Sequence, residues 1–273
     1  WSSDVCSSDL RSNGVVTDDL REKISLFCDV PVEAVIQSTN VDLIYEVPLV
    51  FHDQHLDDYI LKELDLEDRP ASKGKWKEMV ERFKDVKGEV TIGLVGKYVS
   101  LHDAYLSVTQ ALTDAGCENG YKVNIEWINS EDIEKDVSVL DGLDGIIVPG
   151  GFGSRGTEGM IMASKYARDN HIPYFGICYG MQVALIDIAR NKLGLKDANS
   201  TEINPDTNYP IIDLLENQKD IKNVGGTLRL GNYDCTLEKD SLVYSLYGEE
   251  KIKERHRHRY EFNNQFRGQI RSA

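Results

Sequence analysis

The hydrophobic pattern of the chain changes near residue 89. From there to residue 193, apolar runs typical of buried strands alternate with segments whose apolar positions recur at helical spacing. Strands are predicted for EVTIGLVGKYV, YKVNIEWIN, LDGLDGIIVPGG and IPYFGIC, and helices for DAYLSVTQALTDAG, GMIMASKYARDN and GMQVALIDIARNKL. This alternation predicts an α/β fold, a parallel sheet with helices on both faces. The first of these helices is expected to end at Gly116.

The part of the chain before these strands follows a weaker pattern. Residues 18–28 and 56–66 have helical spacing, while Pro48 limits any helix or strand in VDLIYEVPLVF. Residues 67–88 open with polar residues, a proline and a glycine and continue as a charged helix, which predicts a linker between domains. Residues 1–10 match nothing downstream and lack the basic and apolar regions of a signal peptide, so we interpret them as a non-native scar.

Composition and charge exclude several classes of protein. The 273 residues carry a net charge of −15, which argues against general binding to nucleic acid or to an anionic membrane. No apolar run of about 18 residues occurs, so no membrane-spanning helix is expected. The five cysteines are widely spaced without a C-x-x-C pair, so we expect no disulfide framework and no zinc cluster, and we expect a reducing, cytoplasmic location.

The segment GICYG has the spacing of a nucleophile elbow, with Cys178 at a turn from strand to helix. Flanking glycines allow a sharp turn and a close approach of helix to strand. The helix N-terminus is expected to lower the pKa of the thiol, and the N–H of Tyr179 would face a developing oxyanion. A buried, inert cysteine in an α/β core would fit the same residues, so the segment alone leaves both readings open.

A second glycine run, PGGFG at 149–153, also follows a predicted strand. In a parallel sheet, ligands bind at the carboxyl ends of the strands, where both loops fall. The backbone N–H groups of this run could complete an oxyanion hole opposite Cys178. A tight turn would need the same glycines, but two such loops at strand ends, one with a cysteine, favour a site.

The segment RHRHRY at 255–260 alternates basic residues with histidines. On a strand, His256, His258 and Tyr260 would share one face, and the three arginines would share the other. We do not expect a nucleic-acid patch, because six residues are a small footprint in an acidic chain. A metal site at the two histidines is not expected either, because no carboxylate or cysteine stands at ligand spacing.

Longer motifs carry a family resemblance. PGGFGSRGTEGM, IPYFGICYGMQVALIDIARN and NSTEINP resemble the class I glutamine amidotransferase domain. GEVTIGLVGKYVSLHDAYLSVTQAL, VGGTLRLG and ERHRHRYEFNN resemble that domain of the CTP synthase family, and the segment at 21–60 resembles the end of the family's synthetase domain. The resemblance covers residues 11–267 and implies a synthetase remnant at 11–66 and an amidotransferase domain at 89–273.

The resemblance implies two linked reactions. Glutamine is hydrolysed at the cysteine, and the ammonia aminates UTP to CTP in a step that uses ATP and Mg²⁺. The family implies that GTP is an allosteric effector, that the main ATP and Mg²⁺ sites lie in a region preceding this sequence, and that the full-length protein is a homotetramer.

Matching motifs also assign residues. Cys178 matches the nucleophile, and Gly151 with the N–H of Tyr179 matches the oxyanion hole. Gln182 and Glu202 match the groups that hold the α-carboxylate and α-ammonium ends of glutamine, and a carboxylate suits an ammonium group. The remaining matches are Gly180 and Met181 beside the glutamine, Arg259 through its main chain, and Lys23, Thr39, Asn40 and Val41 at a nucleotide.

The chain departs from the family pattern in two places. Tyr179 stands where the family has leucine, so its ring at the pocket wall is expected to alter glutamine binding. The family's catalytic base comes from a His-x-Glu motif beyond RHRHRYE, and no such motif occurs here; His52, His55, His102 and His171 stand in no matching context. We therefore expect an interior fragment without CTP synthesis or efficient glutaminase activity.

Two alternatives remain from the sequence. The missing base favours a catalytically silent module that binds glutamine or a nucleotide. A free-standing cysteine hydrolase of related fold would share the elbow, but it would not need the synthetase-like segment.

Overall fold

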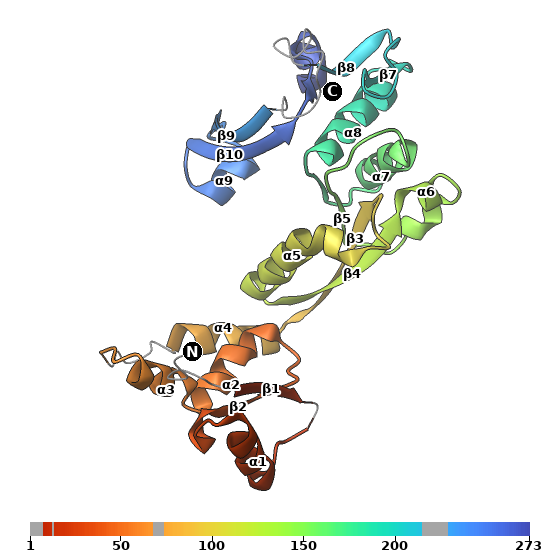
Figure 1. Cartoon of the computed structure of the whole chain (residues 1–273). Helices are drawn as coiled ribbons and strands as arrows, with labels where there is room; N and C mark the ends of the chain where they lie inside the picture. The colour runs from red at the N-terminus through yellow and green to blue at the C-terminus, as the bar shows by residue number, and fades with distance from the viewer. Residues whose placement is uncertain (1–7, 13, 68–73, 215–228) are drawn as a thin grey trace. The chain divides into compact units, whose positions relative to one another are not determined.

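The computed structural model describes residues 8–12, 14–67, 74–214 and 229–273 (Figure 1). The chain divides into two compact units: unit 1 comprises residues 1–88 and 116–122, and unit 2 comprises residues 89–115 and 123–273. None of the helices within the described ranges is long and apolar enough to cross a membrane.

Unit 1 is built around one pair of parallel strands, β1 (Ser8–Ser12) and β2 (Val35–Thr39). Its helices are α1 (Asp18–Cys28), α2 (Val47–Asp53), α3 (Leu56–Glu63) and α4 (Gly74–Lys84), with short 3₁₀ helices at Val32–Ala34 and Ile44–Glu46. A small core of Val30, Ala34 and Val35 packs against Ile24 and Tyr59.

Pro48 limits the helix of the segment VDLIYEVPLVF to its second half, because α2 begins only at Val47. Pro48 lies in the first turn of α2, where the backbone N–H has no partner inside the helix. The missing donor of proline therefore costs this helix nothing.

Unit 2 contains the predicted parallel sheet, in the strand order β4-β3-β5-β6. These strands are β3 (Gly88–Gly96), β4 (Tyr121–Asn129), β5 (Gly145–Val148) and β6 (Tyr174–Gly176). The strands β3, β5 and β6 run parallel, with Ile92 opposite Gly145 and Ile146 opposite Tyr174.

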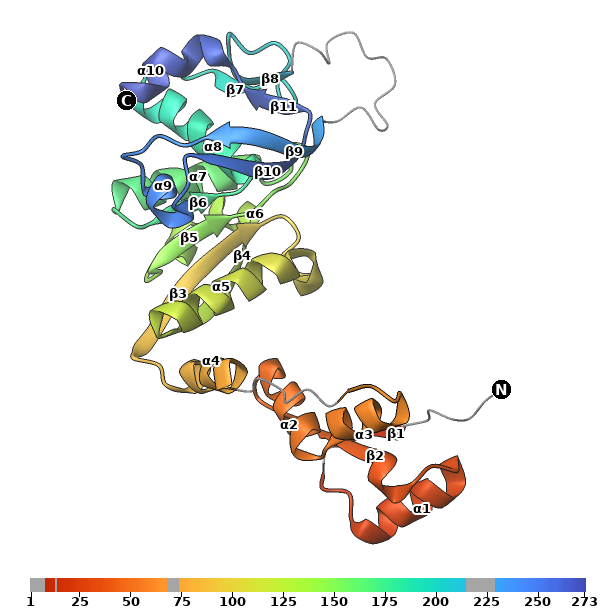
Figure 2. The same ribbon diagram turned by 90° about the vertical axis from the view of Figure 1, so that its left-hand side faces the viewer.

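Helices cover both faces of this sheet, as predicted (Figure 2). They are α5 (Leu106–Asn119), α6 (Ser130–Ile133), α7 (Thr157–Asp169) and α8 (Tyr179–Asp187), with 3₁₀ helices at His102–Tyr105 and Val137–Leu140. Successive residues of β5 enter different cores: Ile146 and Val148 pack in the cluster that contains α7 and α8, and Ile147 packs in the cluster that includes Val108 and Leu112 of α5. Side chains of a strand alternate between faces, so one short strand supplies both cores.

The helix α5 runs past its expected end. Gly116 is buried within the helix, which continues to Asn119 and ends before Gly120, whose φ is 75°. A glycine with positive φ commonly ends a helix, and in α5 that glycine is Gly120 instead of Gly116.

The C-terminal part of unit 2 adds two small sheets. One contains β7 (Ala198–Ser200), β8 (Tyr209–Leu214) and β11 (Tyr260–Phe262), and the other contains the antiparallel strands β9 (Arg229–Thr236) and β10 (Lys251–His258). The remaining helices are a π-helix (Ile188–Lys192) that continues α8, α9 (Leu242–Tyr247), a 3₁₀ helix (Asn264–Phe266) and α10 (Arg267–Arg271).

The predicted alternation of RHRHRY holds only within β10. His256 and His258 are half-buried while Arg255 and Arg257 are exposed. Tyr260 lies on β11, which pairs with β8 instead of β9, but it still lines one cavity together with His256 and His258. Arg259 lies between the two strands and so does not join the other arginines.

Candidate active site

Cys178 lies at a sharp turn between β6 and α8. It is the residue that caps the N-terminus of α8, with φ 55° and ψ −105°. A side chain at positive φ is strained, and such strain gathers at functional sites. The strained turn favours a nucleophile over a cysteine that merely fills the core.

The glycines on either side of the turn are required by contact distances. A Cβ atom on Gly180 would lie 1.9 Å from the Val148 carbonyl oxygen, and one on Gly176 would lie 2.4 Å from the Gly180 carbonyl carbon. The helix start therefore touches the backbone of the neighbouring strand, as the elbow spacing predicts.

The environment of Cys178 disfavours the thiolate. The side chain is open to solvent on one side, but the protein surrounds the sulfur elsewhere, and this burial raises the pKa of the thiol. The backbone N–H of Tyr179 lowers that pKa, and the Glu202 carboxylate raises it further. The expectation that the helix N-terminus lowers the thiol pKa is thus wrong in its net direction, because desolvation outweighs the N–H groups.

The second glycine loop lies directly beside Cys178. A Cβ atom on Gly150 would be 3.7 Å from Cys178 Cβ, and Gly151 is buried next to it. The loop and the elbow line one cavity of about 280 Å³. The structure brings six residues named from the sequence to this cavity: Gly151, Cys178, Tyr179, Gln182, Glu202 and Arg259.

Two of the named residues lie elsewhere. Met181 lines a neighbouring cavity of about 380 Å³, which also reaches Cys178 and Gln182. Gly180 is buried under the turn, where its carbonyl accepts a hydrogen bond from the Tyr174 hydroxyl at 2.8 Å. Gly180 therefore acts through helix packing and lines neither cavity.

The tyrosine that replaces the family's leucine packs beneath the glycine loop. The Tyr179 side chain is 3% exposed, and its hydroxyl lies 2.6 Å from Thr157 Oγ1 and donates to the Gly153 carbonyl at 3.2 Å. Burial raises the pKa of Tyr179 to about 12, so the hydroxyl stays protonated. The ring thus supports the loop from below.

Polar groups of the cavity wall are partly engaged with the protein. Gln182 Nε2 donates to the Tyr260 carbonyl at 2.9 Å, and Glu202 Oε1 accepts from the Gly153 N–H at 3.2 Å. Arg259 Nε is buried, and within the described ranges it has no hydrogen-bond partner. The family resemblance implies a role only for the main chain of Arg259, so the buried side-chain donor is a further feature of this residue.

Two more residues that sequence reasoning missed support the glycine loop. Lys97 Nζ donates to the Phe152 carbonyl at 3.0 Å, and Arg155 Nη2 donates to the Lys97 carbonyl at 2.8 Å. The sequence does contain a signal for Lys97, because this polar residue directly follows Gly96 at the end of the buried strand β3. Residues at the carboxyl ends of parallel strands commonly lie at a ligand site.

His256 and His258 form a pair beside the site. His256 Nδ1 lies 2.8 Å from His258 Nε2, and His258 Nδ1 lies 3.1 Å from the Tyr260 carbonyl oxygen. A carbonyl only accepts, so His258 Nδ1 carries a proton, and a neutral His258 accepts from His256 at Nε2. Both ring nitrogens of His258 are therefore engaged, which makes it a poor base for Cys178.

The four candidate nucleotide-binding residues lie in the other unit. Lys23 is exposed on α1 in unit 1. Thr39 is the last residue of β2, and Asn40 and Val41 follow it.

Comparison with known families agrees with this geometry. The family model for class I glutamine amidotransferases matches residues 100–271. The chain belongs to the class I glutamine amidotransferase family. A second model, described as the CTP synthase N-terminus, matches residues 6–66.

Known members of this amidotransferase family specify the type. The chain is 54% identical to CTP synthase of Clostridium acetobutylicum over 262 residues, covering 95% of this chain and 49% of that protein. It is 50% identical to CTP synthase of Bacillus subtilis over 263 residues, which cover 96% of this chain and 49% of that protein. The chain thus spans about half the length of the curated relatives it matches.

A solved structure of a related amidotransferase is also similar. The glutaminase domain of Trypanosoma brucei CTPS with bound acivicin matches with a TM-score of 0.62 and 37% identity, covering 67% of this chain and 72% of that one. This match confirms the predicted fold and the resemblance to CTP synthase.

Proposed function

We propose that this chain carries the glutaminase site of a CTP synthase. Cys178 hydrolyses the amide of glutamine, and the ammonia serves the ATP-dependent amination of UTP to CTP in the full-length protein. The observation that carries the proposal is the strained Cys178 turn, which opens with the glycine loop into one cavity.

The proposed reaction begins with attack by the Cys178 sulfur on the amide carbon of glutamine. The carbonyl oxygen becomes an oxyanion beside the Gly151 loop and the Tyr179 N–H. The carbon–nitrogen bond then breaks, the amide nitrogen takes a proton and leaves as ammonia, and a γ-glutamyl thioester remains on Cys178. Water cleaves the thioester, which yields glutamate and restores the thiol.

The proposed recognition of glutamine uses the cavity wall. Glu202 receives the α-ammonium group, because a carboxylate in this setting forms a charge-assisted hydrogen bond with it. Gln182, at the same cavity, faces the α-carboxylate end. Arg259, which lines the same cavity, is the nearby cationic group.

Proton transfer limits the activity proposed for these 273 residues. The thiol pKa is raised, both nitrogens of His258 are engaged, and the sequence holds no His-x-Glu motif. A neutral thiol without a base attacks an amide slowly. We therefore expect this chain to bind glutamine and to release ammonia only slowly.

The other components of the proposal concern the full-length protein. By family, UTP, ATP and Mg²⁺ act at the synthetase site, GTP is an effector, the assembly is a homotetramer and the location is cytoplasmic. Within the described ranges, no group of three or more His, Cys, Asp and Glu side chains could hold a metal ion. No Mg²⁺ ligand is therefore assigned among the described residues.

Protection of Cys178 against alkylation tests the proposal. Iodoacetamide labelling of each cysteine is followed by peptide mass spectrometry with and without L-glutamine. We expect L-glutamine, but not D-glutamine, to slow the labelling of Cys178. The exposed Cys28 of unit 1 is the internal control and should react at an unchanged rate. Equal labelling of Cys178 with and without L-glutamine would contradict the proposal.

A catalytically silent glutamine-binding module is the second candidate, favoured by the raised thiol pKa. Ammonia release distinguishes the two: slow release that disappears in Cys178→Ala supports the glutaminase, and protection by glutamine without any release supports the silent module.

A further inference from the structure

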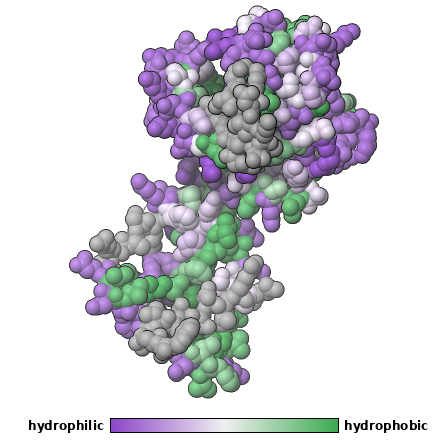
Figure 3. All heavy atoms as spheres, turned by 45° about the horizontal axis from the view of Figure 1, so that its top comes forward, coloured by the Kyte–Doolittle hydropathy of each residue, from purple (hydrophilic) through white to green (hydrophobic). Residues whose placement is uncertain are grey.

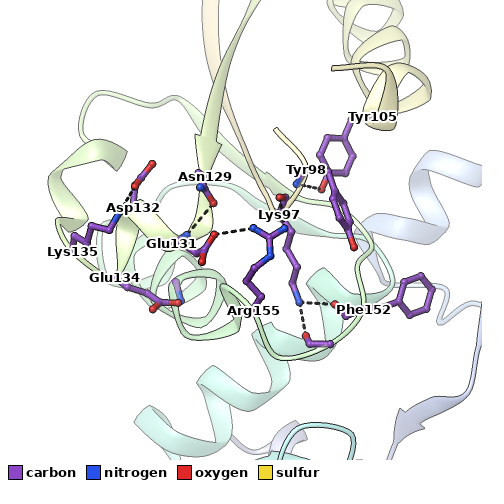
Figure 4. A network of polar contacts seen from close by, with 12 residues as sticks. Lys97, Tyr98, Tyr105, Asn129, Glu131, Asp132, Glu134, Lys135, Phe152 and Arg155 are labelled. Carbon is purple, nitrogen blue, oxygen red and sulfur yellow. Dashed lines mark hydrogen bonds and ion pairs between the residues drawn. The ribbon is translucent and has the colours of Figure 1, made fainter. Parts of the chain in front are cut away.

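Lys97 occupies an unusual place for a lysine. It follows the last residue of β3 and is only 5% exposed. Figure 4 shows its side chain reaching from the end of the strand to the loop that carries Phe152. There its Nζ donates to the carbonyl oxygens of both Phe152, at 3.0 Å, and Gly153. A buried ammonium group needs such acceptors, and the loop supplies them.

The same loop is held at further points. The Tyr179 hydroxyl donates to the Gly153 carbonyl at 3.2 Å, and Lys97 Nζ lies 4.5 Å from the centre of the Tyr179 ring. Arg155 donates back to the Lys97 carbonyl at 2.8 Å and also pairs with Glu131 at 2.8 Å (Figure 4). Lys97 is thus the central contact between the strand end and the loop.

The orientation of one peptide group links Lys97 to Glu202. In a trans peptide the C=O and N–H groups point in opposite directions, and the described chain contains no cis peptide. With its oxygen on Lys97, the Phe152–Gly153 peptide presents its N–H on the opposite side. Gly153 N–H donates there to Glu202 Oε1 at 3.2 Å. Glu202 lines the cavity with Cys178.

Charge acts in the same direction as geometry. Burial lowers the pKa of Lys97 to about 8, the Glu202 carboxylate opposes this shift, and Arg155 adds to it. Below that pH the Lys97 ammonium and the Glu202 carboxylate attract each other across the loop.

We propose that Lys97 is a positioning residue for amine recognition. It orients the Phe152–Gly153 peptide so that the Gly153 N–H holds Glu202 where the α-ammonium group of the substrate arrives. The inference rests on the proposed function, since it requires glutamine to bind beside Cys178. Lys97 thus acts on ligand discrimination through the position of Glu202.

The test compares two ligands that differ in one group. L-Glutamine carries the α-ammonium group, and 4-carbamoylbutanoate lacks it. The Kd of each is measured from its protection of Cys178 against iodoacetamide, in the unaltered chain, Lys97→Met, Glu202→Gln and the double variant. Lys165→Met is the matched control, because Lys165 is an exposed lysine on α7 that pairs with Asp169.

The unaltered chain is expected to prefer L-glutamine by on the order of tenfold to a hundredfold, the worth of one hydrogen bond to a charged group. Lys97→Met should reduce this preference at least about threefold, because a misplaced carboxylate loses part of that bond. Each Kd is referred to the unprotected alkylation rate of the same variant, so a change in thiol reactivity does not enter the preference. The double variant should show the same ligand preference as Glu202→Gln alone, since both changes weaken the same interaction with the α-ammonium group.

The outcomes separate the inference from the function it rests on. If L-glutamine protects the unaltered chain but Lys97→Met keeps the full preference, the inference is wrong and Lys97 is only structural. If L-glutamine protects nothing in the unaltered chain, the proposed function itself fails. If thermal unfolding shows that Lys97→Met does not fold, Lys97→Gln replaces it in the test. This variant keeps a polar donor on a shorter side chain, and the same expected changes in ligand preference apply.

Discussion

Three residues at this site have an energetically unfavourable conformation or environment. Cys178 has a strained backbone, Lys97 is a buried cation, and Arg259 buries a donor that lacks a described partner. Each of these is unfavourable in isolation, and natural proteins keep such features where they serve a ligand. The three residues lie around one glycine loop and one cavity, so we infer that they serve the same ligand site.

The pH dependence of Cys178 alkylation follows from its surroundings. Burial and Glu202 raise the thiol pKa, so the alkylation rate of Cys178 should reach half its maximum at a higher pH than that of a cysteine in an unstructured peptide. Glu202→Gln removes the negative charge, so its midpoint should move to lower pH. The measurement is the iodoacetamide rate of each cysteine from pH 6 to about 11.

The comparison contains its own control. The exposed Cys28 should be labelled at the same rate in both proteins at each pH, since Glu202→Gln leaves the sequence of unit 1 unchanged. A Cys178 midpoint at or below that of a cysteine in an unstructured peptide would show that the helix N-terminus outweighs burial in setting the thiol pKa.

The sequence predicted most site residues, and the misses have a physical cause. The elbow and the glycine run are local patterns, since a strained turn and a close approach permit few residue types. Lys97 and the Arg259 side chain matter through contacts between distant segments, such as Lys97 with Phe152. No local spacing records such a contact.

At the scale of elements, the approach of α8 to β5 sets the position of the nucleophile. Gly180→Ala would place a Cβ 1.9 Å from the Val148 carbonyl, and neither backbone can move without moving Cys178. We expect a loss of unfolding free energy of about 3 kcal/mol, measured by urea denaturation. Gly268→Ala in α10 has nothing within 4 Å and should change stability by less than about 1 kcal/mol. Equal effects would refute the close contact.

The pairing of α7 with α8 depends on a fully buried carboxylate. Asp187 of α8 accepts from Arg168 Nη2 and Ser164 Oγ of α7, each at 3.1 Å, and from Asn191 Nδ2 at 2.8 Å. Arg168→Met would leave the buried charge without its counterion, which costs about 3 kcal/mol. Thermal and urea unfolding measure this loss.

A matched change on the same helix serves as the control. Lys165 pairs with Asp169 at the surface, so Lys165→Met should cost at most about 1 kcal/mol. If both variants lose the same stability, the Asp187 network is not what joins the helices.

Elements were predictable where one pattern dominated. The hydrophobic pattern correctly predicts the strands of the parallel sheet in unit 2 and the helices that pack on it, because helices cover both faces of this sheet. The pattern fails at the end of α5, where a stop is predicted at Gly116 and the helix instead ends before Gly120. Proline and glycine act by position within an element, which local composition does not reveal.

At the scale of the whole molecule, the two units differ in how much apolar surface they bury. Apolar side chains gather at the surface of unit 1 (Figure 3), where Val15, Leu26 and Phe27 are 85%, 79% and 86% exposed. The main core of unit 2 joins residues of β5, α7, α8, β7 and β8. Because burial of apolar area is the main stabilising contribution, unit 1 should be the weaker unit.

Urea unfolding followed by hydrogen exchange and mass spectrometry should therefore show two transitions. Peptides from α1 and β2 should lose protection at a lower urea concentration than peptides from β5 and α8. Val35→Ala, in the core of unit 1, should shift only the first transition, and Val183→Ala, in the core of unit 2, only the second. A single transition in all peptides, shifted by both variants, would show that the units fold as one cooperative body.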